Sequence, residues 1–179
     1  MINMRPKKKG DWMQTYTGEQ LYPIDPDPKH INIVDISHSL SMQCRFNGHC
    51  NRFYSVAEHS VIVSRFCKPE YALAGLMHDA AEAYLSDVIR PIKPYLNGYQ
   101  EIENRLLRMI FDKYDIGYPY PENVKDIDLR ACFTEGQTLM FDAECWYDKA
   151  EPLDFVPECL CPDEAENAFW LRFNELIKN

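Results

Sequence analysis

The sequence predicts an all-α protein, a helical bundle of five to six main helices behind a short irregular N-terminal segment. Hydrophobic residues make up 46% of the 179 positions, enough for one sizeable core. Apolar residues recur at three- and four-residue spacing in several long segments, which is typical of helices that bury one face. Runs that alternate apolar and polar residues, the usual mark of strands, are short and few.

The chain divides into an irregular segment, residues 1–30, and a helical domain, residues 31–179. Prolines, glycines and aspartates are frequent in the first of these segments. A short extended piece, Met13–Tyr16, could pair as a small hairpin. The basic run Arg5–Lys9 fits a solvated tail.

Most of the expected helices have a start or stop signal. Ser55 and Glu58 match the S-x-x-E capping box, and the Asn47-Gly48 pair suits a helix end. Asp163 and Glu164 suit the positive end of a last helix, whose apolar face would include Phe169 and Phe173. Other start signals are Pro69, Asn97 as a cap and Pro121 as a first helical residue. The expected helices cover residues 36–46, 55–67, 69–85, 99–115, 121–143 and 163–176, with loops at 90–94 and 150–160.

Cysteine usage favours a reduced, cytoplasmic protein. The seven cysteines are odd in number and scattered, and no C-x-x-C pair occurs. The N-terminus lacks the apolar region of a secretory signal, and no run approaches the roughly 18 apolar residues of a membrane span. A zinc site made by Cys44, Cys50 and a nearby histidine stays possible but lacks the usual spacing.

The formal net charge of −9 bears on the partners of the protein. An acidic chain repels nucleic-acid backbones, so we expect no stable nucleic-acid partner. Small phosphorylated substrates stay possible, because a metal and a few cations can reverse the field within one pocket. We expect a small-molecule nucleotide substrate, no membrane partner and a homo-oligomer.

The pair His78-Asp79 is the first candidate for chemistry. Both residues fall in the middle of the expected helix 69–85, among small and apolar neighbours. A carboxylate buried without a partner is costly, and a metal ion would offset that cost. The alternative is a surface pair or a hydrogen-bonded pair with no ligand.

Three other residues support a metal site. Glu82 follows His78 by four positions, so the two share a helical face. Asp128 lies where the spacing of apolar residues points to the core, and His59 lies among small and apolar residues. Two imidazoles and two carboxylates suit one divalent transition metal: Zn, Co, Mn, Ni or Fe.

These residues resemble the H…HD…D pattern of the HD-domain phosphohydrolases over roughly residues 31–145. The matching stretches are Ser55–His59, His78–Asp87 and Lys125–Asp128. Two groups are most similar: the bacterial 5′-deoxynucleotidases, and a phage and prophage group that includes dATP triphosphohydrolases. The stretches 36–49 and 53–59 look most like the phage-type group. The resemblance implies a metal held by His59, His78, Asp79 and Asp128, in the host cytoplasm if the protein is phage-encoded.

The resemblance also assigns roles around the metal. Glu82 matches the catalytic carboxylate, and Asp87 matches a second active-site acid. Arg45 matches an arginine that contacts phosphate, and Lys93 matches a loop lysine that could do the same. In this chain Ile127 replaces the usual small residue before the last ligand.

The implied function is a metal-dependent phosphohydrolase of deoxynucleotides, most readily a (d)NTP triphosphohydrolase of the dATP type. A 5′-deoxynucleotidase is the alternative within this class, and a non-catalytic, nucleotide-binding regulatory protein is the alternative outside it. His59 would need a hydrogen bond to its second nitrogen, from Glu58 or a backbone carbonyl. The base would lie against an aromatic side chain, either Phe46, Phe53, Tyr84 or Tyr95.

Overall fold

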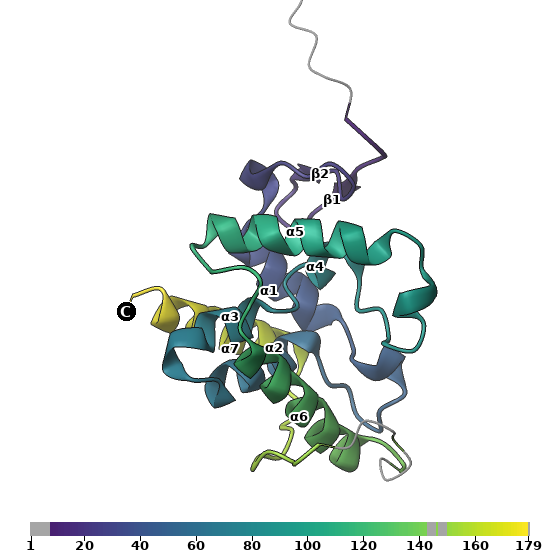
Figure 1. Ribbon diagram of the computed structural model, residues 1–179, viewed down its shortest axis with the longest axis vertical. Coiled ribbons are helices and arrows are strands. Elements are labelled where there is room, and N and C mark those ends of the chain that lie inside the picture. Colours follow the sequence, from purple (N-terminus) through teal and green to yellow (C-terminus); the bar gives the residue numbers. More distant parts are fainter. Residues whose placement is uncertain (1–7, 143–145, 147–149, 179) are drawn as a thin grey trace, which may run out of the picture.

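A computed structural model describes residues 8–142, 146 and 150–178, and it confirms the all-α prediction (Figure 1). The α-helices are α1 Ile33–Met42, α2 Val56–Phe66, α3 Ala72–Met77, α4 Glu82–Leu85, α5 Tyr99–Lys113, α6 Glu122–Leu139 and α7 Pro162–Leu176. The short 3-10 helices are η1 Pro28–His30, η2 Phe46–Gly48, η3 Pro69–Tyr71 and η4 Lys93–Tyr95. In the described part of the chain no helix is long and apolar enough to cross a membrane.

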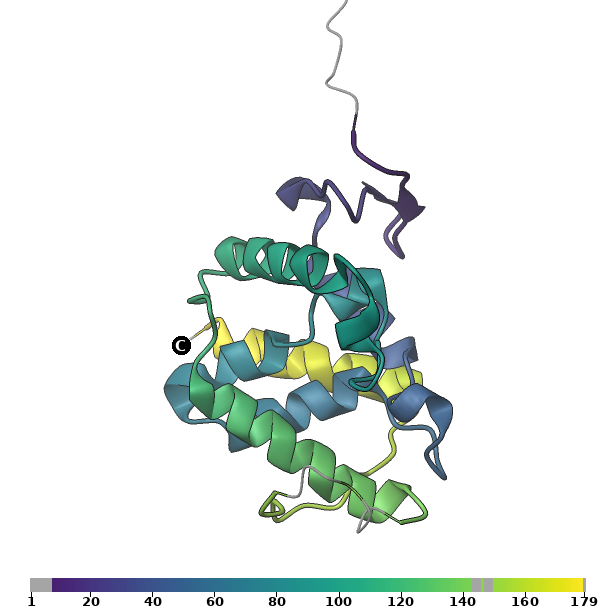
Figure 2. The same ribbon diagram turned by 45° about the vertical axis from the view of Figure 1, so that its right-hand side comes forward.

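The centre of the bundle is formed by α1, α2, α3 and α7. Helix α2 packs against both α3 and α7, and α1 packs along α7. Helix α5 covers one side of this group and α6 the opposite side (Figures 1 and 2). The largest fully buried side chains include Tyr54, Leu76, Met77, Phe111 and Phe169. Because neighbours surround α2, every residue from Val56 to Ser64 is buried.

The N-terminal segment contains the expected hairpin. Strand β1, Met13–Gln14, pairs antiparallel with β2, Gln20–Leu21. Leu21 is fully buried and joins the main core. The basic run Arg5–Lys9 lies mostly outside the described residues.

Helix α2 begins at the predicted N-cap, but only half of the capping box forms. The backbone N–H of Glu58 donates to Ser55 Oγ at 3.0 Å, as expected. The Glu58 carboxylate instead accepts the backbone N–H groups of Glu158, Cys159 and Leu160 at 2.8–3.0 Å. Glu58 therefore ties α2 to the connection before α7.

The prediction of one helix over residues 69–85 is wrong. The segment divides into η3, α3, a turn at 78–81 and α4, so His78 and Asp79 lie in the turn and not within a helix. The ring nitrogen Nδ1 of His78 donates to the Gly75 carbonyl at 2.8 Å, and a continuing helix would use that carbonyl for Asp79 N–H. The N–H groups of Ala80 and Glu82 instead bond carbonyls three residues back.

The first helix also differs from its prediction. It begins at Ile33, where the Asn32 side chain accepts from Asp35 N–H at 2.9 Å, and it ends at Met42. The chain then runs extended, and Arg45 N–H donates to the Tyr54 carbonyl at 2.8 Å. Arg45 consequently lies on an extended segment directly before η2 and not in the predicted helix over residues 36–46.

The C-terminal half follows the predictions with shifted boundaries. Helix α5 starts after Gly98 (φ 79°), which takes the N-cap position expected for Asn97. Pro121 is the N-cap of α6 and not its first helical residue. Helix α6 ends at Leu139, short of the predicted end at 143, a position outside the described residues. The connection before α7 and its buried face are confirmed: Ala165, Phe169 and Phe173 are buried.

Candidate metal centre

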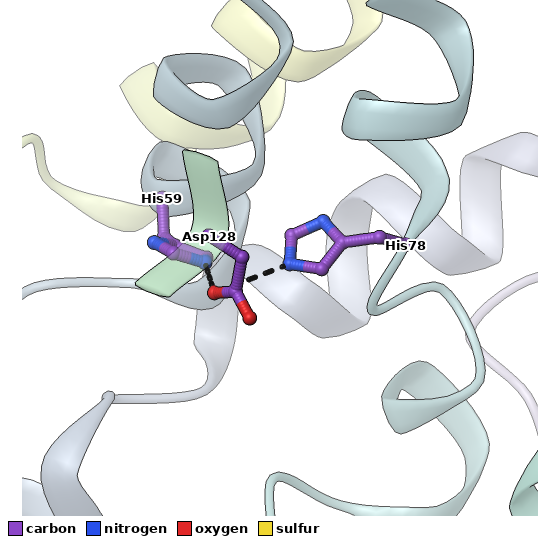
Figure 3. A group of neighbouring side chains, drawn as sticks. All are labelled: His59, His78 and Asp128. Atoms are coloured by element: carbon purple, nitrogen blue, oxygen red, sulfur yellow. Dashed lines mark hydrogen bonds and ion pairs between the residues drawn. The ribbon is translucent and has the colours of Figure 1, made fainter. Parts of the chain in front are cut away.

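Three of the four predicted ligands meet at one point in the bundle (Figure 3). His59 lies in the second turn of α2, His78 follows α3, and Asp128 lies on α6. Nε2 of His59 and Nε2 of His78 lie 3.1 and 3.7 Å from Asp128 Oδ1. One ligand atom from each of the three residues lies within 4.8 Å of the others, so this group could hold a metal ion.

Asp79, the fourth predicted ligand, borders the same point. Its Oδ2 lies 3.1 Å from His78 Nε2 and 3.8 Å from His59 Nε2. Nε2 of His78 is buried and has no hydrogen-bond partner of good geometry among the described residues. A buried polar atom left in this state is costly. A divalent cation would bond this nitrogen and be neutralised by the two carboxylates, so the donor set fits a metal.

The surroundings of the two carboxylates favour their ionised form. Burial alone would raise the pKa of Asp128, but the hydrogen bond to His59 and the nearby His78 ring hold that pKa well below its usual value. Burial opposes ionisation of Asp79 as well, yet the His78 charge lowers the pKa of Asp79 to about 2. Both carboxylates are therefore anionic at neutral pH, which is the state that binds a metal.

The second ring nitrogen of each histidine is held by a different group. Nδ1 of His78 donates to the Gly75 carbonyl, whereas Nδ1 of His59 lies 2.6 Å from Glu135 Oε1. The prediction that Glu58 or a backbone carbonyl supports His59 is therefore wrong. With Nδ1 as the donor, both rings present Nε2 to the site.

Glu135, on α6, was not identified from the sequence. It is fully buried, and it also accepts a hydrogen bond from Tyr54 Oη at 2.8 Å and one from Arg45 Nε at 3.2 Å. Burial alone would raise the pKa of Glu135, but the charges of His59 and Arg45 lower it. Its position seven residues after Asp128, on the same helical face, is the signal that could have pointed to it.

Arg45 reaches the edge of the metal centre. It is 8% exposed, and its Nη1 lies 3.9 Å from Asp79 Oδ2. Its guanidinium lies over the Phe46 ring, 5.4 Å from the ring centroid. The structure therefore brings Arg45 to the predicted site, but as a buried, ion-paired residue.

Glu82 lies beside the ligands as the first residue of α4. It is 5% exposed, and its Oε2 has no hydrogen-bond partner among the described residues. Burial, followed by the charges of Asp79 and Asp87, raises the pKa of Glu82 well above its usual value. A buried carboxyl group with a raised pKa is suited to proton transfer.

Lys93 and Asp87 complete the group around Glu82. Nζ of Lys93 lies 3.5 Å from Glu82 Oε1 and 2.8 Å from Oε1 of Glu103, an acid on α5 that was not identified from the sequence. The backbone N–H of Asp87 donates to Gln43 Oε1 at 2.9 Å, and burial raises the pKa of the Asp87 carboxyl.

A cavity of about 570 Å³ lies between the hairpin, α1 and α4. Glu82 and Tyr84 contribute to its lining, whereas neither Arg45 nor any of the four predicted metal ligands does. Of the other aromatic candidates, Tyr95 is 81% exposed, and the Phe46 ring lies tilted against Trp146 with 5.9 Å between the ring centroids. The fourth, Phe53, is also exposed.

The possible zinc site at Cys44 and Cys50 does not form in the described part of the chain. The two Sγ atoms lie 3.5 Å apart, but no third histidine, cysteine or acid completes a ligand group there.

Two known proteins are similar to this chain. It is 36% identical over 171 residues to a protein named "Uncharacterized protein YfdR" from Escherichia coli (strain K12), covering 92% of this chain and 95% of that protein. It is 35% identical over 153 residues to "Uncharacterized protein RCAP_rcc00048" from Rhodobacter capsulatus, covering 80% and 78%. No family model matches the chain.

Proposed function

The chain belongs to the family of Escherichia coli YfdR, and we propose that it is a metal-dependent phosphohydrolase that acts on deoxynucleotides. One observation carries the proposal. A buried acid, Glu82, and a buried cation, Arg45, flank the group of His59, His78 and Asp128, and neither is needed to hold the metal. The first can transfer a proton, and the second can bind a phosphate.

The metal would be one divalent transition ion, Zn, Co, Mn, Ni or Fe, held by His59, His78, Asp79 and Asp128. When bound, it supplies Lewis acidity and lowers the pKa of water toward neutrality. The imidazoles are already oriented for this task, because their Nδ1 atoms donate to Glu135 and to the Gly75 carbonyl.

Side chains around the metal would bind the phosphate groups and transfer the proton. Arg45 would use its Nη atoms to bind phosphate oxygens, since its Nε is occupied by Glu135. Glu82 would take a proton from the attacking water or return one to the leaving group. Lys93, beside Glu82, would add positive charge for a further phosphate oxygen, and Asp87 would orient water or the sugar.

Within this class we favour a triphosphohydrolase of the dATP type. The cavity beside Glu82 is in the size range of small-molecule sites and has room for a base and a sugar. Two cations, Arg45 and Lys93, suit a chain of several phosphates. A 5′-deoxynucleotidase, which would release phosphate from dNMPs, is the second candidate, because one phosphate could satisfy Arg45 alone.

A non-catalytic nucleotide-binding protein is the candidate from another class. A binding module has no need for a proton-transfer group, whereas Glu82 is buried beside the ligands at a clear cost in desolvation.

A hydrolysis panel tests the proposal. Metal-loaded protein is incubated with dNMPs, NMPs and dNTPs, and the products are separated by chromatography. Release of triphosphate and deoxyadenosine from dATP supports the first candidate, and release of phosphate from dNMPs supports the second. Binding of nucleotides without any product would support the regulatory protein.

A further inference from the structure

One buried carboxylate contacts both halves of the candidate site. Oε1 of Glu135 lies 2.6 Å from Nδ1 of the metal ligand His59, and Oε2 accepts from Nε of the phosphate-binding Arg45 at 3.2 Å. We propose that Glu135 is a positioning residue that sets the orientation of the metal ligand and of the phosphate-binding cation together. This inference rests on the proposed function.

The contact with His59 determines which nitrogen can bind a metal. A carboxylate can only accept, so Nδ1 of His59 must carry a proton. In the neutral imidazole, which is the form that binds a metal, Nε2 then has the free lone pair. Nε2 is the nitrogen that faces Asp128 and Asp79. Without Glu135 the ring could adopt the other tautomer, which has a proton where the metal should bind.

The contact with Arg45 determines which guanidinium nitrogens are free. Glu135 engages Nε, and Nη1 lies 3.9 Å from Asp79, at the edge of the metal centre. The Tyr54 hydroxyl group donates to the Glu135 oxygen that also faces His59, so the carboxylate itself is fixed. Glu135, Tyr54, Arg45 and His59 are all buried, so these side chains orient one another within the protein.

The shared carboxylate makes the two halves of the site interdependent. An acid accepts hydrogen bonds on both sides, but an amide accepts on one side and donates on the other. A glutamine at this position could therefore accept the hydrogen bond from His59 or the one from Arg45, but not both. An alanine would lose both hydrogen bonds.

The test uses full-length protein and three variants: Glu135→Gln, Glu135→Ala and Glu58→Gln. Glu58→Gln is the matched control, because Glu58 is also a buried glutamate next to the site but bonds only backbone N–H groups. The readouts are Zn²⁺ or Mn²⁺ affinity by chelator competition, binding of inorganic phosphate to the metal-loaded protein, and the melting temperature. None of these readouts requires hydrolysis, so failure of this inference is distinct from failure of the proposed function.

We expect Glu135→Gln to lose roughly 10–100-fold in affinity for the metal or for phosphate, the usual effect of removing a group that supports a metal ligand. Glu135→Ala, if it folds, should lose both, whereas Glu58→Gln should lose neither. The inference is overturned if Glu135→Gln keeps both affinities. It is also overturned if Glu58→Gln weakens them as much, since the effect would then come from general destabilisation.

Discussion

Nε2 of His59 and Oδ1 of Asp128 lie 3.1 Å apart, although 69 positions separate the two residues in the sequence. The contact exists because α2 and α6 pack together, with Glu135 two turns further along α6 holding the other side of the His59 ring. A metal at this point would connect α2, α6 and the turn after α3. The packing of the bundle therefore determines the positions of the side chains in the candidate metal site.

Removal of a ligand should remove the metal. We expect the unmodified protein to contain one divalent ion per chain, and His78→Ala, Asp79→Ala and Asp128→Ala to contain little or none. Elemental analysis of the purified proteins measures this content. The matched control is Asp126→Ala, which removes an exposed acid from the same helix as Asp128. Full metal content in Asp79→Ala would exclude that residue as a ligand.

Removal of the metal should lower the stability of the fold. A ligand that binds only the folded state at a hundred times its Kd adds about 2.7 kcal/mol to the free energy of unfolding. Treatment with a chelator should therefore lower the melting temperature, and the ion that is added back should restore it. The ligand variants should show no such response, and an equal response in Asp128→Ala would contradict the site.

Glu82 should matter for turnover and not for the metal. Glu82→Gln keeps the size of the side chain and removes a buried acid, so the fold and the metal content should persist. The rate kcat should fall by roughly 10²–10⁴, the usual contribution of general acid–base catalysis. Steady-state kinetics measures the change, with Glu101→Gln, an exposed acid on α5, as the control. A wild-type kcat in Glu82→Gln would remove Glu82 from the mechanism.

Arg45 should contribute to stability as well as to phosphate binding. Arg45→Ala leaves the buried Glu135 without its cation, which should cost about 3–5 kcal/mol in the free energy of unfolding. Arg45→Lys keeps the charge but loses the planar guanidinium, so its effect should appear mainly in nucleotide affinity. Chemical denaturation and equilibrium binding measure the two effects, with Arg65→Ala, an exposed arginine at the end of α2, as the control.

The same Arg45→Lys variant separates the substrate candidates. A selective loss of dATP affinity is expected for a triphosphohydrolase, and an equal loss for dAMP and dATP is expected for a monophosphatase. Unchanged affinity for both nucleotides would exclude Arg45 from substrate binding.

Close packing of α2 and α3 should depend on Gly75. A Cβ atom at this position would lie 2.9 Å from Cys67 Sγ and 3.2 Å from Ser64 Cα on α2. We expect Gly75→Ala to cost about 1–3 kcal/mol in stability and to weaken metal binding, because the Gly75 carbonyl also holds His78. Gly117→Ala, which has open space around it, is the control. An equal stability of the two variants would contradict this account.

The sequence was sufficient for the helical class, for the N-cap of α2 at Ser55 and for the buried face of α7, because these depend on local signals. The sequence also identified three residues that come together in the structure: His59, His78 and Asp128. It did not predict the turn at His78, because apolar spacing continues through it. The break comes from a side-chain bond to the Gly75 carbonyl, which no periodicity reveals.

The ion pair between Glu135 and Arg45, and the burial of Arg45, lay beyond local signals for a different reason. The two residues are 90 positions apart, and each looks like an ordinary polar residue in its own segment. Only the packing of α6 against the extended segment after α1 makes them a buried ion pair. For Glu58 the local signal is present but the contact differs. Its carboxylate was expected to cap its own helix, and it instead accepts a backbone N–H group 100 positions away.

The most direct test of the central proposal is metal reconstitution followed by hydrolysis. Metal-free protein is titrated with Zn²⁺, Co²⁺, Mn²⁺, Ni²⁺ or Fe²⁺, and cleavage of dATP and dAMP is measured at each step. We predict no cleavage without metal, and activity that rises with added metal and reaches its maximum at one ion per chain. Equal cleavage by the metal-free protein, or no cleavage of any deoxynucleotide by the fully loaded protein, would contradict the proposal.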